Sequence, residues 1–282
     1  MSKEQNMVSQ GVTLMAFGKP IFFEFAFNMA LSLRKHSPNV PIQLIHDHYI
    51  KELGDRANIF NVLTDISSQA YTDNKRIQAG KGKLSMFNLL HFDETLYLDV
   101  DGVVLQDISP LFDQEQDFKI QKDAMHWVDD HDGVAKQYNL KEQAIGCNSS
   151  IMFVRKSKTT KKLFADALKA IDEPFENMAT EWFHGMHPDE LYLGISMSKN
   201  NLADVYFETR FPVYFQRRID YHINKSVDDV KKDFFVLGCY GNHRYNHRFV
   251  YDLYQRENRS NWREIIGMSP RKDIHKLMRY KH

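Results

Sequence analysis

The sequence predicts an α/β fold in which strands and helices alternate along one domain. Val12–Phe17 is a short apolar run of strand length, and Ile42–Ile45 is a second one. Between them, Phe22–Lys35 carries its apolar residues at helical spacing. Pro38 ends that helix, because proline disfavours a helical residue before it. A crossover helix of this length joins parallel strands, so we expect the chain to open as a β-α-β unit.

The later segments continue this alternation. Strands are expected at Thr95–Leu98, Val103–Leu105, Met125–Val128, Ile151–Val154 and Phe234–Leu237. Helices are expected at Leu84–Leu90, Thr159–Ala170 and Pro188–Ser198, while Arg56–Leu63 is ambiguous. No repeat or low-complexity linker interrupts them. The sequence therefore predicts one α/β domain over residues 8–245, followed by an extension over residues 246–282.

The composition predicts a folded, soluble protein. The chain has 282 residues, of which 43% are hydrophobic and 13% aromatic, so a disordered chain is excluded. Lysine plus arginine number 37, as do aspartate plus glutamate, which excludes nucleic-acid binding by overall charge alone. No apolar run approaches the ~20 residues of a membrane helix, and the N-terminus has no hydrophobic signal region. Cys147 and Cys239 lie beside apolar residues, which indicates buried thiols and a cytoplasmic location.

The C-terminal stretch differs from the rest of the chain. From Gln255 to His282 it carries eight basic and three acidic residues, which leaves a net charge of +5. One interpretation is a solvated helical appendage. The other is a patch for an anionic partner, either nucleic acid or a membrane surface.

Two carboxylates follow an apolar strand in the segment 96–101, Leu-Tyr-Leu-Asp-Val-Asp. In open α/β sheets, ligands bind outside the carboxyl ends of the strands. Residues i and i+2 of an extended segment point the same way, so Asp99 and Asp101 can converge. Two such anions repel unless a cation lies between them, and a divalent cation with oxygen ligands supplies that charge. The alternative is a surface turn with both side chains in water.

Two enzyme classes place such a pair after an apolar strand. One is the haloacid dehalogenase-type phosphatases, whose Asp-x-Asp-Gly motif residues 99–102 match, with Asp99 as the nucleophile. That motif normally lies on the first strand, with a lysine and a second acidic pair well downstream. Here several elements precede it, and Asp129-Asp130 follows too soon to be the distal pair. The phosphatase is kept as an alternative.

The other class is the nucleotide-sugar glycosyltransferases, and the segment Leu84–Phe112 resembles glycosyltransferase family 8. This family includes glycogenin and bacterial galactosyl- and glucosyltransferases. Its helix, Leu-Tyr-Leu-Asp-x-Asp strand and Pro-Leu-Phe turn are similar to this segment. Four more segments resemble the family in the same order, Ser32–Pro38, Cys147–Met152, Pro188–Leu191 and Thr209–Phe211. The resemblance covers about residues 12–245.

The resemblance implies a GT-A fold, a single Rossmann-like mixed sheet flanked by helices. It implies that Asp99 and Asp101 bind Mn²⁺ or Mg²⁺, which bridges to the diphosphate of the nucleotide-sugar donor and offsets charge on that leaving group. Lys83 lies near the family's basic donor contact, with Lys81 as the competing choice. The other positions implied to contact the donor are Phe17, Gly18, Val100, Gly241 and Arg244.

The resemblance also implies sugar transfer with retention, with a UDP-sugar as the first choice of donor. Asn148 and Asp189 would line the donor sugar and the acceptor. Glu190 falls where many members carry glutamine; it would position groups near the anomeric carbon, or act as a nucleophile. Asp129 or Asp130 would contact the acceptor. That acceptor is a glycan, a protein, a lipid-linked sugar or, as for some phage enzymes, a modified DNA base.

Two departures from the family pattern stand out. The family's first strand usually ends in acidic residues near the nucleotide base, whereas residues 16–19 here are Ala-Phe-Gly-Lys. The family's late His-x-x-Gly-x-x-Lys also changes. Gly238 replaces the histidine and Arg244 replaces the lysine as a phosphate contact. His243 is the candidate that supplies the missing metal ligand from a shifted position.

Overall fold

The computed structural model describes residues 9–67, 72–73, 76–77, 79–122, 128–175, 187–202, 204–207, 213–215, 232 and 234–238. The chain divides into two compact units. The first unit comprises Met1–Gly11, Ser68–Leu98 and Leu111–Phe211, and the second comprises Val12–Ser67, Asp99–Pro110 and Pro212–His282.

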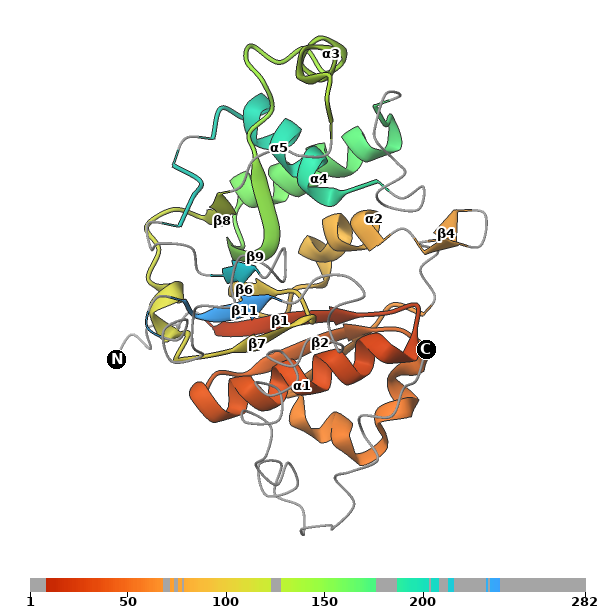
Figure 1. The fold of residues 1–282 in the computed structure, drawn as a ribbon, viewed down its shortest axis with the longest axis vertical. Helices are drawn as coiled ribbons and strands as arrows, with labels where there is room; N and C mark the ends of the chain where they lie inside the picture. The colour runs from red at the N-terminus through yellow and green to blue at the C-terminus, as the bar shows by residue number, and fades with distance from the viewer. Residues whose placement is uncertain are drawn as a thin grey trace, which may run out of the picture. The chain divides into compact units, whose positions relative to one another are not determined.

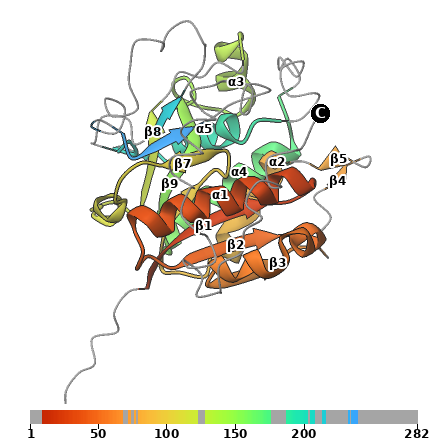
Figure 2. The same ribbon diagram turned by 60° about the horizontal axis from the view of Figure 1, so that its bottom comes forward.

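Three parallel strands form the base of the second unit. They are β1 (Gln10–Ala16), which belongs to this unit from Val12 on, β2 (Ile42–His46) and β3 (Val62–Asp65). Ala16 pairs with His46, and His46 pairs with Asp65, so the three strands end together. Figure 2 shows them side by side beneath α1. The predicted β-α-β opening is confirmed.

In the crossover helix α1 (Pro20–His36), every residue from Phe23 to Leu33 except Asn28 is buried, so the helix is covered on more than one face. Pro20 starts the helix because its fixed φ suits the first helical position, where the missing N–H is not needed. Three basic residues, Arg34, Lys35 and His36, end it, where cations offset the helix dipole. The backbone N–H of Ser37 then closes the last turn onto the Leu33 carbonyl at 2.7 Å.

A second group of strands in this unit joins distant parts of the chain. β7 (Gly102–Val104) pairs antiparallel with β11 (Val236–Gly238), which pairs parallel with β10 (Val213–Phe215). α1 packs against β7, where Ser32 Oγ accepts a hydrogen bond from Val104 N–H at 3.0 Å. The same unit contains the 3-10 helix η1 (His48–Ile59).

The first unit is built around β9 (Cys147–Arg155). This strand pairs antiparallel with β6 (Glu94–Leu98) on one side and with β8 (Phe118–Lys122) on the other. The register with β8 is interrupted by a bulge between Ile120 and Gln121. β9 is buried from Cys147 to Val154, so it reads as a continuous apolar and small-residue strand instead of an alternating one.

Helices α4 (Lys158–Asp172) and α5 (Asp189–Lys199) pack on each other within this unit (Figure 1). Ser157 caps α4 through a hydrogen bond from Thr160 N–H at 3.2 Å. The remaining elements of the unit are α2 (Ala79–Leu84), η2 (Ser85–Leu89), η3 (Ser109–Phe112, shared with the second unit), α3 (His131–Gln137) and the short pair β4 (Thr72–Asp73) and β5 (Arg76–Ile77).

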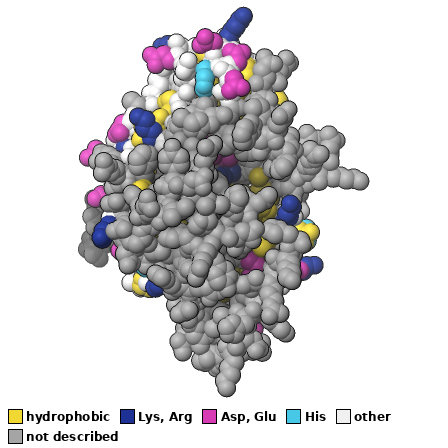
Figure 3. Space-filling model, in the orientation of Figure 1, with side chains coloured by type: hydrophobic (Ala, Val, Ile, Leu, Met, Phe, Trp, Pro, Cys, Tyr) yellow, Lys and Arg dark blue, Asp and Glu magenta, His cyan; other side chains and the backbone are white. Residues whose placement is uncertain are grey.

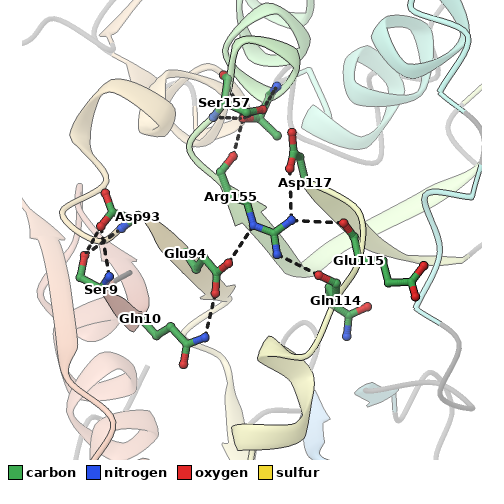
Figure 4. Close-up of polar contacts among 10 residues, drawn as sticks. Ser9, Gln10, Asp93, Glu94, Gln114, Glu115, Asp117, Arg155 and Ser157 are labelled. Atoms are coloured by element: carbon green, nitrogen blue, oxygen red, sulfur yellow. Dashed lines mark hydrogen bonds and ion pairs between the residues drawn. The ribbon is translucent and has the colours of Figure 1, made fainter. Parts of the chain in front are cut away.

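Arg155 links several segments of the first unit at the end of β9 (Figure 4). Its Nε donates to Glu94 Oε1 at 2.7 Å, and its two terminal nitrogens reach the Gln114 carbonyl at 2.8 Å and Asp117 Oδ1 at 3.2 Å. Partial burial opposes its charge, but the hydrogen bonds to Glu94 and Asp117 raise the pKa of Arg155. Beside it, Asp93 accepts hydrogen bonds from the backbone and hydroxyl of Ser9.

Most of the expected elements match observed ones. The predicted helix at 84–90 is observed as the end of α2 followed by the 3-10 helix η2. β8 and α3 were not predicted, and the expected strand at Met125–Val128 falls mainly outside the described residues. Cys147 is a buried free thiol as predicted, whereas Cys239 and the basic extension lie outside them. Among the described residues, none of the helices has the length and apolar character needed to cross a membrane.

Candidate functional site

Asp99 and Asp101 lie in the short connection between β6 and β7. β6 is fully buried up to Leu98, and β7 begins at Gly102. Asp99 and Asp101 are both partly exposed, whereas Val100 between them is buried with 7% exposure. The chain bends at Val100 and Asp101, so this connection is not the continuous extended segment that the sequence predicts. Both aspartates are nevertheless accessible, one on each side of a buried valine.

The position of this connection is fixed by a close contact between two strands of the second unit. Gly102 pairs with Gly238 across the antiparallel ladder of β7 and β11. A side chain at Gly102 would lie 2.8 Å from the Leu237 carbonyl and 3.1 Å from Met29 Cε, so only glycine fits. β11 ends at Gly238, which is one residue before the level of Asp101 in the ladder. Gly241, His243 and Arg244 follow Gly238 in the sequence and lie outside the described residues.

The end of β1 carries the residues predicted to lie near the nucleotide base. Phe17 and Gly18 are half-buried, and Gly18 has φ of 87°, a left-handed conformation that favours glycine. The Gly18 N–H donates to Asp47 Oδ2 at 2.7 Å, and Tyr49 N–H donates to Asp47 Oδ1 at 3.0 Å. Asp47 is only 9% exposed. An acid thus lies beside the end of β1, directly after the neighbouring strand β2.

Our sequence reasoning missed Asp47, although a signal for it was present. Asp47 directly follows the apolar strand Ile42–His46, just as Asp99 follows Leu98. Parallel neighbours end at the same sheet edge, so an acid after β2 belongs beside the end of β1. Comparing the ends of both predicted strands would have identified it.

Lys83 makes contacts in the first unit that join three elements. Its Nζ donates to Ser149 Oγ of β9 at 2.9 Å and lies 3.3 Å from Asp189 Oδ2 of α5. It also lies 5.3 Å from the centre of the Tyr97 ring. The side chains of Lys83 and Asp189 are only 12% and 11% exposed. Such a partly desolvated ammonium interacts more strongly with nearby anions than a surface lysine does.

Lys81, the competing choice, lies in a different environment. It pairs with Asp172 of α4, and these two side chains are 38% and 57% exposed. Screening by solvent weakens such a pair. The geometry therefore favours Lys83 over Lys81 as the lysine that accompanies Asp189.

The sequence places Lys83 there through a glycine in α2. A side chain at Gly80 would overlap with the His187 carbonyl and lie 3.2 Å from Asp189 N. Glycine thus allows α2 to approach the start of α5 closely. Asp189 and Glu190 occupy the first turn of α5, where the helix dipole favours carboxylates. Asp189 Oδ2 is buried and has no hydrogen-bond partner among the described residues, although it is ion-paired with Lys83.

Asn148 and Glu190 lie at the starts of β9 and α5, which are in contact. Cys147 Sγ donates to the Glu190 carbonyl at 3.4 Å. Asn148 is 3% exposed, and its Oδ1 accepts a hydrogen bond from Ser150 N–H at 3.0 Å. The Glu190 side chain is half-buried. The structure thus brings Lys83, Asp189 and the segment that carries Asn148 together.

His187 precedes this first turn of α5. Its Nδ1 is 3.0 Å from the hydroxyl of Tyr192. Burial lowers the pKa of His187 and raises the pKa of Tyr192, because each charged form is desolvated. His187 is therefore expected to be neutral when the protein is folded at neutral pH.

Asp129 and Asp130, the predicted acceptor contacts, lie at the start of α3. Both are exposed, and Asp130 Oδ1 caps the helix by accepting a hydrogen bond from Gly133 N–H at 2.7 Å. Figure 3 shows acidic side chains gathered around a histidine at the end of the view where Figure 1 places α3. Asp130 thus has a structural role that the sequence analysis did not anticipate.

The donor atoms of the Asp99–Asp101 segment are suited to Mn²⁺ or Mg²⁺, because both ions prefer carboxylate oxygens. In the part of the chain that the structure describes, no three His, Cys, Asp or Glu side chains come together as a metal site. Asp99 and Asp101 offer two carboxylates to such an ion. His243, the predicted further ligand, lies outside the described residues.

Neither a protein-family model nor a curated protein matches the sequence. Solved structures do match. The galactosyltransferase LgtC, in complex with donor and acceptor sugar analogues, is 13% identical with a TM-score of 0.56, over 95% of this chain and 99% of LgtC. The bifunctional glycosyltransferase WbbM has a TM-score of 0.60 and 13% identity, over 93% of this chain and 52% of WbbM. The glycosyltransferase GlyE of Streptococcus pneumoniae has a TM-score of 0.59 and 14% identity, over 92% of this chain and 62% of GlyE.

These similarities show that the chain has a mixed α/β GT-A fold, as predicted. Parallel pairs in the second unit and antiparallel pairs in the first agree with that mixed architecture. The alternative of a haloacid dehalogenase-type phosphatase gains no support from them.

Proposed function

We propose that this protein is a glycosyltransferase that moves a sugar from a nucleotide-sugar donor to an acceptor. The observation that carries this proposal is the segment 99–101 after the buried strand β6, in a chain with a GT-A fold. Asp99 and Asp101 are both partly exposed, while Val100 between them is buried. Solved structures with this fold include a galactosyltransferase and a mouse xyloside xylosyltransferase, so both hexosyl and pentosyl donors remain candidates.

The proposed task of Asp99 and Asp101 is to hold Mn²⁺ or Mg²⁺. When bound, the ion would neutralise charge on the departing nucleoside diphosphate. The close packing of Gly102 on β11 fixes the connection that carries both carboxylates, so little reorganisation is needed when the ion binds. We propose His243 as a further ligand and Arg244 and Gly241 as phosphate contacts.

Lys83 is the proposed cation for the donor phosphates. It is held by Ser149 and Asp189 and is largely removed from water. Asp189 Oδ2 is buried and has no hydrogen bond among the described residues. We therefore propose that it accepts a hydrogen bond from a hydroxyl of the sugar. Asn148 is proposed to line the donor sugar, and Phe17, Gly18 and Val100 to contact the nucleoside. UDP is the proposed nucleotide.

Glu190 is proposed to act near the anomeric carbon, in a reaction that retains configuration. One solved structure with this fold is of LgtC with a glutamine-to-glutamate change in its active site. This chain has a glutamate, Glu190, in the first turn of α5 beside Asp189. Asp129 is proposed to contact the acceptor, and Asp130 to hold α3 in place beside it.

The proposal is tested by a screen of nucleotide sugars, with thermal melting measured with and without Mn²⁺. A true donor should raise the melting temperature only with the metal, because a ligand that binds the folded state stabilises it. The same mixtures should release nucleoside diphosphate. Phosphate release from phosphomonoesters without turnover of any nucleotide sugar would favour the phosphatase alternative. Failure of every donor to bind would refute the proposal.

A further inference from the structure

Ser149 is the hydrogen-bond partner that links Lys83 to β9. The Ser149 side chain is fully buried, and its Oγ accepts from Lys83 Nζ at 2.9 Å. The carboxylate of Asp189 lies somewhat farther from the same nitrogen, at 3.3 Å, and Oδ2 has no hydrogen bond among the described residues. Asp189 therefore attracts the ammonium, while Ser149 sets the direction of one N–H bond.

The backbone around Ser149 is shaped for this contact. β9 pairs with β8 through Met152 with Ile120, and then through Asn148 with Gln121. Residues 149–151 of β9 are therefore the extra residues of this bulge and have no paired counterparts on β8. Bulges re-aim side chains and occur beside active sites. Here the bulge includes Ser149, the residue that contacts Lys83 of α2.

Burying the hydroxyl group of a serine at this position costs free energy unless the hydroxyl is hydrogen-bonded. A buried hydroxyl is tolerated only when it is hydrogen-bonded, and an alanine in a fully buried strand avoids that requirement. Lys83 supplies the bond. The contact also orders the flexible lysine chain before a ligand arrives, which reduces the entropy lost on binding.

We propose that Ser149 is a positioning residue, which holds the ammonium of Lys83 in the orientation that binds the diphosphate of the donor. This inference rests on the proposed function. The hydroxyl acts through Lys83, and it makes no contact with the reacting atoms. It differs from Asp189, which we assign to the sugar as well as to the lysine.

The test uses the full-length protein with UDP, GDP and ADP, each with Mn²⁺, and measures their dissociation constants by calorimetry. Ser149→Ala should weaken the best-bound nucleotide about 10-fold, because a hydrogen bond to a charged group is lost. Ser149→Thr keeps the hydroxyl and should stay closer to the wild type. Ser196→Ala is the matched control, since that buried serine donates to the Leu163 carbonyl in the same unit. It should leave the dissociation constant within twofold.

A double-mutant cycle separates positioning from a general structural effect. In a Lys83→Gln background, Ser149→Ala should change nucleotide affinity less than twofold, because the group that it positions is gone. An equal loss in both backgrounds would overturn the inference, as would an unchanged affinity in Ser149→Ala alone. If the wild type binds none of the three nucleotides, the proposed function fails first.

A measurement on the wild-type protein covers the case in which Ser149→Ala does not fold. Amine acetylation followed by mass spectrometry should show that UDP with Mn²⁺ protects Lys83 several-fold. Lys81, which pairs with Asp172 nearer the surface, should keep its reactivity. Equal reactivity of Lys83 with and without the nucleotide would refute the inference.

Discussion

The carboxylate of Asp47 accepts a hydrogen bond from the backbone N–H of Gly18 at 2.7 Å. The contact ties the left-handed turn after β1 to the end of β2, and the other carboxylate oxygen caps η1 through Tyr49 N–H. One buried acid thus fixes two connections at the carboxyl ends of parallel strands. This edge is where ligands bind in open α/β sheets.

Asp47→Asn should lower the stability of the protein by about 1–2 kcal/mol. Asparagine keeps one oxygen but presents an NH₂ group to one of the two backbone N–H donors, so one of them loses its acceptor. Urea unfolding measures the change. Glu52→Gln, at an exposed acid on the same unit, should differ little from the wild type. Equal stability of both variants would show that the Gly18 contact contributes nothing.

Asp101→Asn should abolish the stabilisation that Mn²⁺ and a donor give, and lower transfer roughly 100-fold or more. The amide keeps the shape of the side chain but removes the charge that attracts the ion. Asp113→Asn, an exposed acid, is the control and should retain activity. Removing metal with EDTA should have the same effect on the wild type as the substitution. Full activity in EDTA would contradict a metal-dependent mechanism.

Gly80→Ala should displace α2 from the start of α5, because its methyl group would overlap with the His187 carbonyl. We expect a loss of about 1–3 kcal/mol in stability together with weaker donor binding. Gly11→Ala provides the comparison, since its methyl group would overlap with the ring of Phe92 in the same unit. Both should melt earlier in thermal scans. Only Gly80→Ala should alter donor affinity, and an equal effect of both on affinity would disprove the link to Lys83.

The stability of the protein should decrease as pH falls below about 6.5, the usual pKa of histidine. Burial lowers the pKa of His187 in the folded state, so the unfolded chain binds a proton first. The contribution is complete above that pH and is lost as pH falls toward the lower folded value. Urea unfolding at pH 7.5 and 5.5 should show a smaller decrease in His187→Gln than in the wild type. An equal decrease in both proteins would show that His187 does not contribute to it.

Arg155→Met should destabilise the first unit by about 2 kcal/mol, because it leaves the buried Glu94 carboxylate without its cation. Arg155 is itself 30% exposed, which keeps the loss below that of a fully buried pair. Arg155→Lys retains the charge but cannot reproduce the fork of bonds shown in Figure 4. Its melting temperature should therefore lie between those of the wild type and Arg155→Met. A Met variant as stable as the wild type would contradict this order.

The strongly patterned elements were predictable from the sequence. β1, α1 and β2 appear within a few residues of their expected bounds, because an apolar run, a helical stripe and a proline stop all agree. β8 was missed. Its sequence, Phe-Lys-Ile-Gln-Lys, alternates like an exposed strand, yet Lys119 is 1% exposed and pairs with Asp204. The burial of Lys119 is explained by its ion pair with Asp204, which is distant in the sequence.

Part of the candidate site was also predictable, because local sequence patterns mark it. Asp99 and Asp101 could be found because a local run of apolar residues precedes them. The role of Asp47 required knowledge that β1 and β2 are neighbours, and the Ser149 contact required the packing of α2 on α5. Asp130 shows the opposite case, since a helix cap and a substrate contact have the same appearance in a sequence.

The ladder between Gly102 and Gly238 also bears on how the protein folds. β7 is made early during synthesis, yet its partner leaves the ribosome much later, after the whole first unit. Until then the nascent chain carries an unsatisfied strand edge directly after the two aspartates. We expect assembly of that ladder to be among the slowest steps of folding, because its contact is so distant along the chain. The proposed metal ligands would then become ordered only after residues 236–238 have been synthesised.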